Sequence, residues 1–177
     1  MSEVASSTGD APIDRPSLRA HNLSIALFQP QIAPNTGNVA RLCVATGTAL
    51  HLVRPLGFVL SDQNLRRSAM DYWPRLKLTV HDDEGAFFTA MNETRFWLFT
   101  SKAKRSLWEA DFEDGDCLVF GSETHGLPEG LVARFQTRAI RIPQIEGERC
   151  LNLSTAAGIS MYEALRQLHN RSQRGLD

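Results

Sequence analysis

Residues 117–126 of the chain are CLVFGSETHG, a short apolar run that ends in a turn between two glycines. An apolar run of this length without a polar position is typical of a strand in a parallel sheet covered on both faces. Gly121 and Gly126 bound the turn, and Leu127-Pro128 follow it. Open α/β sheets bind ligands beyond the carboxyl ends of their strands. The turn is therefore a candidate binding site.

The same pattern recurs along the chain and predicts an α/β fold. Six segments are strand candidates: LSIALFQ (23–29), ALHLV (49–53), KLTV (77–80), RFWLFT (95–100), CLVFG (117–121) and AIRIP (139–143). Five segments place apolar residues at helical spacing: NVARLCVATGT (38–48), DQNLRRSAM (62–70), DEGAFFTAM (83–91), LPEGLVARF (127–135) and STAAGISMYEALRQLHN (154–170). Strands alternating with helices predict a mostly parallel sheet flanked by helices.

Length and composition indicate one soluble domain. The chain has 177 residues, of which 42% are hydrophobic and 22% charged, and its formal net charge is −1. Residues 1–22 are small and polar and are expected to be a flexible tail, with one domain over 23–177. No apolar stretch approaches the roughly 20 residues that span a bilayer, and no targeting segment is present, so a cytoplasmic location is expected.

Cysteine and histidine spacing gives no sign of a metal or a disulfide. Cys43, Cys117 and Cys150 are widely separated and include no C-x-x-C pair, and the five histidines are equally scattered. No metal is expected. Five of the acidic residues lie close together in one stretch, which is interpreted as a solvated loop. These residues are Glu109, Asp111, Glu113, Asp114 and Asp116.

Three polar turns follow strand candidates, and none matches a standard phosphate or acyl motif. They are QPQIAPNTGNVAR (29–41), GSETHG (121–126) and IPQIEGERCLNLSTAAG (142–158). A Walker A loop needs Lys and Ser or Thr after its last glycine, whereas Leu127 follows Gly126. A dinucleotide fingerprint needs three glycines, but the first turn has only Gly37. A nucleophile elbow needs one residue between its glycine and its serine, as in G-x-S-x-G, but Ser122 directly follows Gly121, so the motif does not match.

Each polar residue in these turns also has a purely structural explanation. Asn35 or Ser154 could cap a helix, and Glu123 could be a carboxylate favoured by a helix dipole. Arg41 could lie on the wet face of a helix. These explanations leave one fact open, which is that three such turns occur in one short domain.

The three motifs resemble those of the SPOUT superfamily of knotted RNA methyltransferases, in the branch that methylates ribose 2′-hydroxyls. They are PNTGNVARLCVATG (34–47), LVFGSETHGLP (118–128) and IRIPQIEGERCLNLSTAAGISMYEA (140–164). The compact length and the segments LHLVRPLGF and LRRSAMDYW are most similar to small enzymes that modify the wobble nucleotide of tRNA. The resemblance extends from about residue 23 to residue 169. It implies a deep C-terminal trefoil knot, an exception to the rule that chains are unknotted.

The resemblance also implies an activity and a set of site residues. The expected reaction transfers a methyl group from S-adenosylmethionine to the ribose 2′-hydroxyl of the wobble nucleotide, cytidine or modified uridine, in tRNA. The catalytic residues would be Arg41, Asn35, Glu123 and Ser154. The methyl donor would contact Phe99, Thr100, Gly121, Glu123, Ile142, Pro143, Cys150, Leu151 and Asn152. RNA would contact Arg41, Arg66, Arg67, Lys102 and Arg105, and a homodimer would form around Tyr162.

Several finer expectations follow. An arginine guanidinium stays protonated in proteins, so for Arg41 a grip on phosphate and on the forming alkoxide is favoured over a general base. Ile145, with neighbouring apolar residues, would form a slot for adenine, and Gly121 would let the backbone approach the donor. Trp73 and Trp108 are expected to be packed.

Two alternatives remain from the sequence. A family member could methylate another ribose in tRNA or ribosomal RNA, although such relatives often carry additional RNA-binding segments. A knotted RNA-binding protein without activity would lack the catalytic residues, and all four are present.

Overall fold

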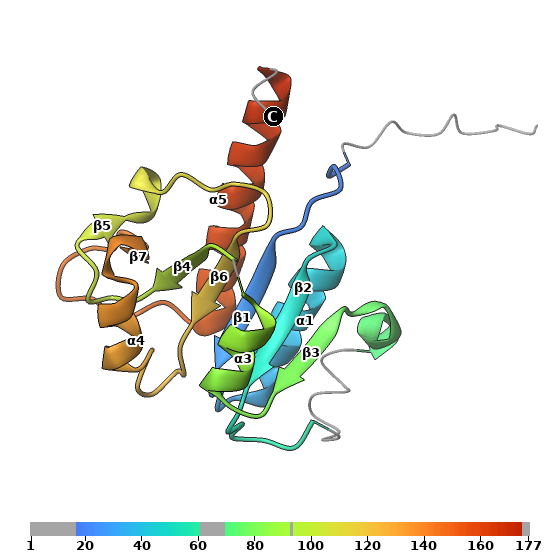
Figure 1. Cartoon of the computed structure of the whole chain (residues 1–177), viewed down its shortest axis with the longest axis vertical. Helices are drawn as coiled ribbons and strands as arrows, with labels where there is room; N and C mark the ends of the chain where they lie inside the picture. Colours follow the sequence, from blue (N-terminus) through green and yellow to red (C-terminus); the bar gives the residue numbers. More distant parts are fainter. Residues whose placement is uncertain (1–16, 61–69, 93, 175–177) are drawn as a thin grey trace, which may run out of the picture.

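The sheet at the centre of the molecule contains seven strands in the order β3-β2-β1-β6-β4-β7-β5 (Figure 1). The computed structural model describes residues 17–60, 70–92 and 94–174, and every strand pairing in this part is parallel. The strands are β1 (Ser24–Phe28), β2 (Ala49–Val53), β3 (Leu78–His81), β4 (Phe96–Phe99), β5 (Arg105–Ser106), β6 (Cys117–Phe120) and β7 (Ala139–Arg141). The helices are α1 (Ala33–Thr46), α3 (Glu84–Ala90), α4 (Glu129–Arg134) and α5 (Leu153–Gln173), with 3-10 helices η1 (Met70–Arg75), η2 (Leu107–Glu109) and η3 (Gln136–Arg138).

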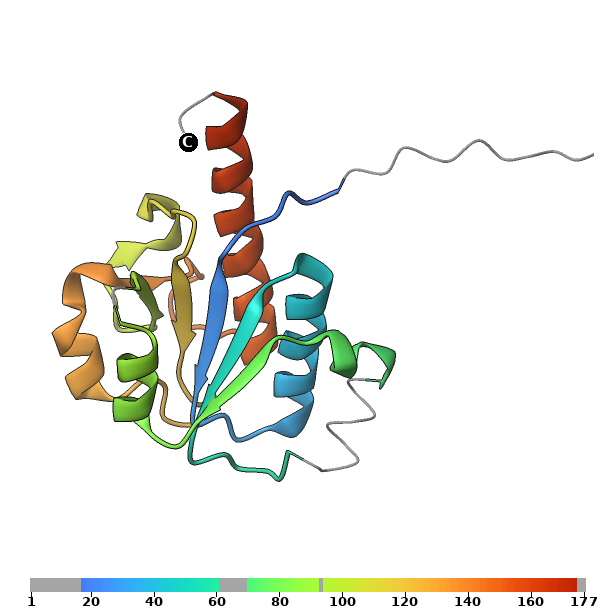
Figure 2. The same cartoon turned by 45° about the vertical axis from the view of Figure 1, so that its right-hand side comes forward.

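Side chains along each central strand alternate between two hydrophobic cores, one on each face of the sheet. In β1, Ile25 and Leu27 belong to the core that includes α1 and α5. Ala26 and Phe28 belong to the core that includes α3 and α4. Figures 1 and 2 show the same division, with α1 and α5 on one face and α3 and α4 on the other. A strand buried on both faces needs an unbroken apolar run, which is why the sequence predicts these strands.

All six predicted strands are confirmed to within two residues at each end, and one strand was not predicted. The missed strand, β5, has two residues, Arg105 and Ser106, and pairs with β7 at the sheet edge. Two residues cannot show a period of two, so no pattern could reveal it. The helix predicted over 62–70 lies outside the described residues except for Met70, which begins η1.

Two helices begin differently from their predictions. Helix α1 starts at Ala33, before the predicted start, with Pro34 in its first turn where a proline costs no hydrogen bond. Arg41 therefore lies about two turns into α1, further along than a start at residue 38 would place it. The structural alternative in which Asn35 caps this helix is excluded, because Asn35 lies inside the helix. The cap of α5 is Asn152 and not Ser154.

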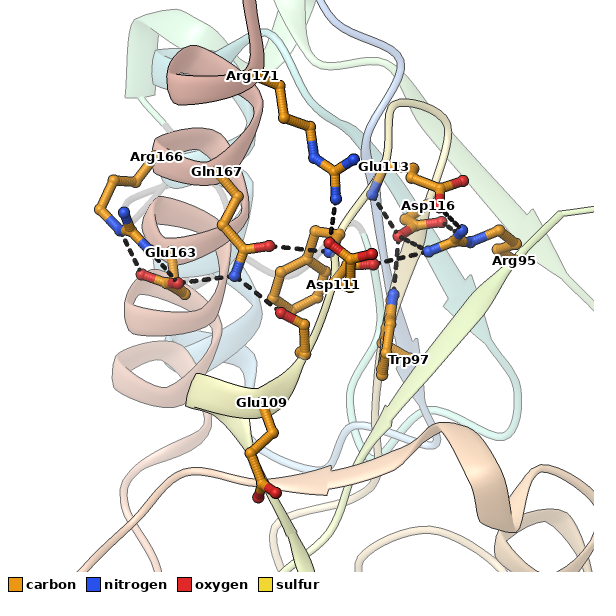
Figure 3. A network of polar contacts seen from close by, with 12 residues as sticks. Arg95, Trp97, Glu109, Asp111, Glu113, Asp116, Glu163, Arg166, Gln167 and Arg171 are labelled. Carbon is orange, nitrogen blue, oxygen red and sulfur yellow. Dashed lines mark hydrogen bonds and ion pairs between the residues drawn. The ribbon is translucent and has the colours of Figure 1, made fainter. Parts of the chain in front are cut away.

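Arginines pair with three side chains of the acidic stretch, Asp111, Glu113 and Asp116 (Figure 3). The interpretation as solvated charges holds for the four exposed residues and is wrong for Asp116, which is buried. The Asp116 side chain is 1% exposed; it pairs with Arg95 at 2.8 Å and accepts a 2.8 Å hydrogen bond from the Trp97 indole. Arg171 on α5 pairs with Asp111. Burial raises the Asp116 carboxyl pKa, and the hydrogen bonds and Arg95 oppose that effect. The Asp111 pair ties the long segment between β4 and β6 to α5, and the Asp116 contacts tie it to the start of β4.

Two histidines on neighbouring strands form a hydrogen-bonded pair on the α3 face. His51 Nδ1 lies 3.0 Å from His81 Nε2, and the ring of Phe87 meets both imidazoles edge-on. One imidazole must donate and the other accept, so the accepting imidazole must be neutral, and the pair cannot form when both rings are protonated. Burial, followed by repulsion from His81, lowers the pKa of His51 to about 4, and burial also lowers the pKa of His81.

The histidine pair should make folding stability depend on pH in a defined window. Between pH 6.5 and about 4 the unfolded chain binds a proton that folded His51 resists, so stability falls as pH falls. We expect the free energy of unfolding to fall by about 2 kcal/mol over this window, a value that already allows for solvent screening because His51 is partly exposed. Urea unfolding at pH 7 and pH 4.5 measures it.

Two variants isolate this effect from other groups that titrate in the same window. His51→Gln keeps a neutral hydrogen-bonding group and should lose that part of the slope. His169→Gln, at an exposed histidine of α5, should keep it. An unchanged slope in His51→Gln would contradict the assignment.

The first described residues contact three parts of the fold, beginning with Arg19, which donates to the Ser172 hydroxyl of α5. His21 Nε2 lies 2.8 Å from the Thr46 carbonyl oxygen, and the Asn22 amide donates to Asp114. Across residues 17–60, 70–92 and 94–174 no helix combines the length and apolar character that crossing a bilayer requires.

The trefoil knot fits the strand order, in which β7 enters between β4 and β5 before α5 returns to α1. It stays a prediction.

Candidate active site

The three polar turns meet at one cavity of about 740 Å³. They follow β1, β6 and β7, which lie close together in the sheet, so parallel pairing brings their carboxyl ends to the same edge. A cavity of this size is in the range that holds a small molecule. The rings of Phe99 and Phe120, which end β4 and β6, stack at 4.5 Å and form part of its wall.

Most of the residues predicted to contact the methyl donor line this cavity. They are Phe99, Thr100, Gly121, Glu123, Ile142, Cys150, Leu151 and Asn152. Pro143 is half-buried and is not among the lining residues. Ile145 is 82% exposed and does not line the cavity, so the predicted adenine slot does not include it.

Phe120, Leu127 and Ala156 line the cavity and were not predicted to do so. Phe120 carried a signal, since it ends the apolar run before the glycine turn, at the strand end where ligands bind. Leu127 and Ala156 resemble ordinary core residues in the sequence.

The Glu123 carboxylate binds the start of α1. Its Oε2 accepts from the backbone amide of Gln31 at 2.8 Å, and its Oε1 accepts from the amide of Ile32 at 3.3 Å. The Asn35 side-chain amide donates to Oε1 at 2.9 Å. The amides at a helix start need acceptors, and Ile32, the N-cap, has no side chain able to supply one. Glu123 therefore caps α1 from a different turn.

Asn152 joins this cluster to α5. Its Nδ2 donates to Asn35 Oδ1 at 2.9 Å, and its Oδ1 accepts from the backbone amide and the hydroxyl of Ser154 at 2.9 and 2.8 Å. Glu123, Asn35, Asn152 and Ser154 are therefore linked in one hydrogen-bonded chain across all three motifs.

Arg41 lies on α1 beyond this chain. Its side chain is exposed and is not among the residues that line the cavity. Asn35 and Arg41 share one helix, about 9 Å apart along its axis, so whatever fixes the start of α1 also fixes the base of Arg41.

The turn after β6 is closed by its own backbone. The amides and carbonyls of Ser122 and Gly126 exchange hydrogen bonds of 3.1 and 2.9 Å, and Gly126 has a left-handed φ of 69°. A Cβ on Gly121 would lie 2.0 Å from the Gly126 carbonyl carbon. Gly121 is thus required by the turn itself, which differs from the predicted reason, backbone approach to the donor.

Gln29, at the end of β1, has an unusual backbone conformation. Its φ is 50°, and it is the only non-glycine residue with a positive φ in the described part of the chain. Such conformations cost free energy and concentrate at functional loops. The backbone turns here into the loop that reaches Glu123.

The predicted RNA-binding residues have varied surroundings. Arg66 and Arg67 lie outside the described residues. Lys102 is exposed at the cavity rim and pairs with Glu129 at 2.7 Å, which lowers the pKa of the Glu129 carboxyl. The Arg105 guanidinium lies 5.1 Å from the centroid of the Trp97 ring and donates to backbone carbonyls.

Of the two tryptophans predicted to be packed, one is packed and the other is exposed. Trp73 packs against the larger core, as expected. Trp108 is 77% exposed, so the prediction that it is packed is wrong. It lies in η2, which begins with a Ser106–Glu109 capping box. Tyr162 on α5 is 53% exposed, and Ile159, one turn earlier, is 42% exposed.

In the described part of the chain, no three His, Cys, Asp or Glu side chains gather as a metal would need.

Comparison with known proteins identifies the family. The model of the SpoU rRNA methylase family matches residues 22–162. A tRNA (cytidine(34)-2′-O)-methyltransferase of Escherichia coli K12 is 42% identical over 147 residues, covering 82% of this chain and 94% of the relative. One from Methylovorus glucosotrophus is 44% identical over 144 residues, covering 81% and 94%.

Solved structures agree with this assignment. A structure described as giving insights into 2-OH methylation of C/U34 on tRNA has a TM-score of 0.82 and 47% identity, covering 85% of this chain and 99% of that one. The methyltransferase AviRb of Streptomyces viridochromogenes in complex with AdoMet, at 22% identity and a TM-score of 0.76, shares the fold. The chain belongs to the SpoU rRNA methylase family of RNA methyltransferases.

Proposed function

We propose that this enzyme transfers a methyl group from S-adenosylmethionine to the ribose 2′-hydroxyl of the wobble nucleotide, cytidine or modified uridine, in tRNA. The observation that carries the proposal is that the three motif turns converge on one cavity. The relatives named for this reaction match the chain over nearly their whole length.

The cavity suits the donor chemically. Its wall combines aromatic and aliphatic side chains, Phe99, Phe120 and Ile142 among them, with polar loop backbone that follows β6 and β7. Flat apolar surface suits adenine, and backbone groups suit its polar edge. When bound, S-adenosylmethionine would supply a sulfonium methyl group that the ribose oxygen attacks in line, so that the C–O bond forms as the C–S bond breaks, S-adenosylhomocysteine leaves and the hydroxyl proton passes to solvent.

Arg41 supplies the positive charge of the proposed reaction. Its guanidinium would grip the phosphate beside the target ribose and stabilise the forming alkoxide, as a fork of donors can and a point charge cannot. The hydrogen-bonded chain of Glu123, Asn35 and Asn152 would hold the helix that carries it.

The proposal includes a cytoplasmic homodimer. Ile159 and Tyr162 leave an apolar strip exposed on α5, and dimer formation would cover it. Two copies would also pool the basic side chains of a chain whose net charge is only −1. Lys102 and Arg105 are the described candidates to contact the anticodon loop, where single-stranded RNA is recognised by stacking and phosphate contacts.

The reaction is tested on the natural substrate pool. We expect the protein to transfer label from methyl-labelled donor to total tRNA from a strain lacking this activity, and nuclease mapping should place it on the ribose of the first anticodon nucleotide. The same tRNA already methylated there should accept none. Label on a base, or on a ribose elsewhere, would contradict the proposed specificity.

A further inference from the structure

One charge, the Glu123 carboxylate, decides which group donates and which accepts at each step of the hydrogen-bonded chain at the cavity. A carboxylate only accepts hydrogen bonds, so Asn35 must turn its Nδ2 toward Glu123, at 2.9 Å. Its Oδ1 then faces Asn152, which must donate through Nδ2, also at 2.9 Å. The remaining oxygen of Asn152 therefore faces the first amides of α5. We call Glu123, Asn35 and Asn152 the amide relay.

The relay joins two helix starts that are far apart in sequence. Glu123 accepts from the amides before α1, and Asn152 accepts from the amides that open α5. Both helix starts carry partial positive charge, and the relay places one full negative charge between them. Asn35, in the middle of the relay, is only 6% exposed, whereas Glu123 is partly buried and Asn152 is exposed.

The relay also connects the cavity to Arg41. All three relay residues line the cavity, whereas Arg41 does not. The link between them is the rigid body of α1, because Asn35 is in its first turn and Arg41 follows about two turns from its start. A shift at the start of α1 would be carried to Arg41 and displace its guanidinium.

We propose that Glu123, Asn35 and Asn152 are positioning residues that fix α1, and with it Arg41, relative to the methyl-donor cavity. The inference rests on the proposed function and assigns Glu123 a role through the protein backbone instead of contact with the reacting groups. A shift of about 1 Å in a group that orients the substrate lowers turnover strongly without removing the donor's own contacts.

A polarity swap tests the relay. Glu123→Gln keeps the size but turns an amide N–H toward the Gln31 amide or toward Asn35, where donor would meet donor. The double variant Glu123→Gln with Asn35→Asp reverses one link. The introduced glutamine then donates to the introduced aspartate, which still accepts from Asn152. An acid at the third helical position can also reach back to the Ile32 amide, as in a capping box.

The expected results separate positioning from binding. We expect Glu123→Gln to lower kcat about tenfold or more while the KM for the donor changes by less than about threefold. The double variant should recover kcat to within about threefold of the original enzyme, with its melting temperature restored. Asp82→Asn removes an exposed carboxylate outside the cavity and should leave kcat unchanged.

Two results would overturn the inference. One is a Glu123→Gln enzyme with unchanged kcat. The other is a double variant no better than the single, which would mean that Glu123 acts on the reacting groups directly. If Glu123→Gln does not fold, recovery of both folding and turnover in the double variant supports the relay, and failure to recover contradicts it.

Failure of the proposed function would be recognised separately. If the original enzyme methylates no tRNA ribose, that function is wrong. The melting temperatures of the original, Glu123→Gln, Asn35→Asp alone and the double variant would still measure the coupling between positions 123 and 35. Absence of coupling would contradict the relay, and coupling would support it.

Discussion

Replacing Arg41 by lysine should lower methylation turnover by about 100-fold, although the positive charge is kept. A guanidinium can donate two parallel hydrogen bonds to a phosphate and still face the ribose oxygen, whereas an ammonium is a point charge on a flexible stem. The donor cavity does not include Arg41, so donor affinity should stay the same. Single-turnover rates with saturating tRNA, and calorimetry with S-adenosylhomocysteine, measure the two effects.

Arg54→Lys is the matched control for this substitution. Arg54 is an exposed arginine that pairs with Asp82 at 3.6 Å, outside the candidate site. It should leave turnover unchanged. Near-normal turnover in Arg41→Lys would exclude the two-pronged grip and leave charge alone as the contribution of Arg41.

The strands and the cavity edge could be predicted because their causes are local. A strand such as β6, CLVF, is apolar throughout because both its faces are buried. Its polar continuation then marks the edge where a ligand can bind. The resemblance in the three turns supplied the identities of the lining residues, and most of them do line the cavity.

The start of α1 could not be predicted because its cap comes from elsewhere. Sequence rules search for a cap next to the helix, whereas the acceptor is Glu123, separated from Gln31 by 92 positions. The same limit applies to the acidic stretch. Asp116 is buried against Arg95 and Trp97, 21 and 19 positions away, whereas its sequence neighbours predict only a solvated charge. The prediction for Trp108 is wrong because an aromatic residue in a segment without periodicity gives no indication of its direction.

Gly121→Ala should have the largest effect on the fold of the site. The added Cβ would lie 2.0 Å from the Gly126 carbonyl carbon and 2.2 Å from the Leu127 nitrogen, and both are backbone atoms that cannot rotate aside. The turn must open, which would move Glu123 away from α1. We expect a loss of about 3 kcal/mol or more in unfolding free energy and loss of S-adenosylhomocysteine binding.

Variants of two nearby glycines separate the effect of a steric clash from the effect of backbone conformation. A Cβ at Gly126 meets nothing within 4 Å, but its φ is 69°, so Gly126→Ala should cost about 1 to 2 kcal/mol through conformation alone. A Cβ at Gly130, inside α4, also meets nothing, so Gly130→Ala should stabilise the protein by about 0.5 to 1 kcal/mol. Urea unfolding of the three variants gives the order. If Gly121→Ala proved no worse than Gly126→Ala, closure of this turn would not be what requires a glycine at position 121.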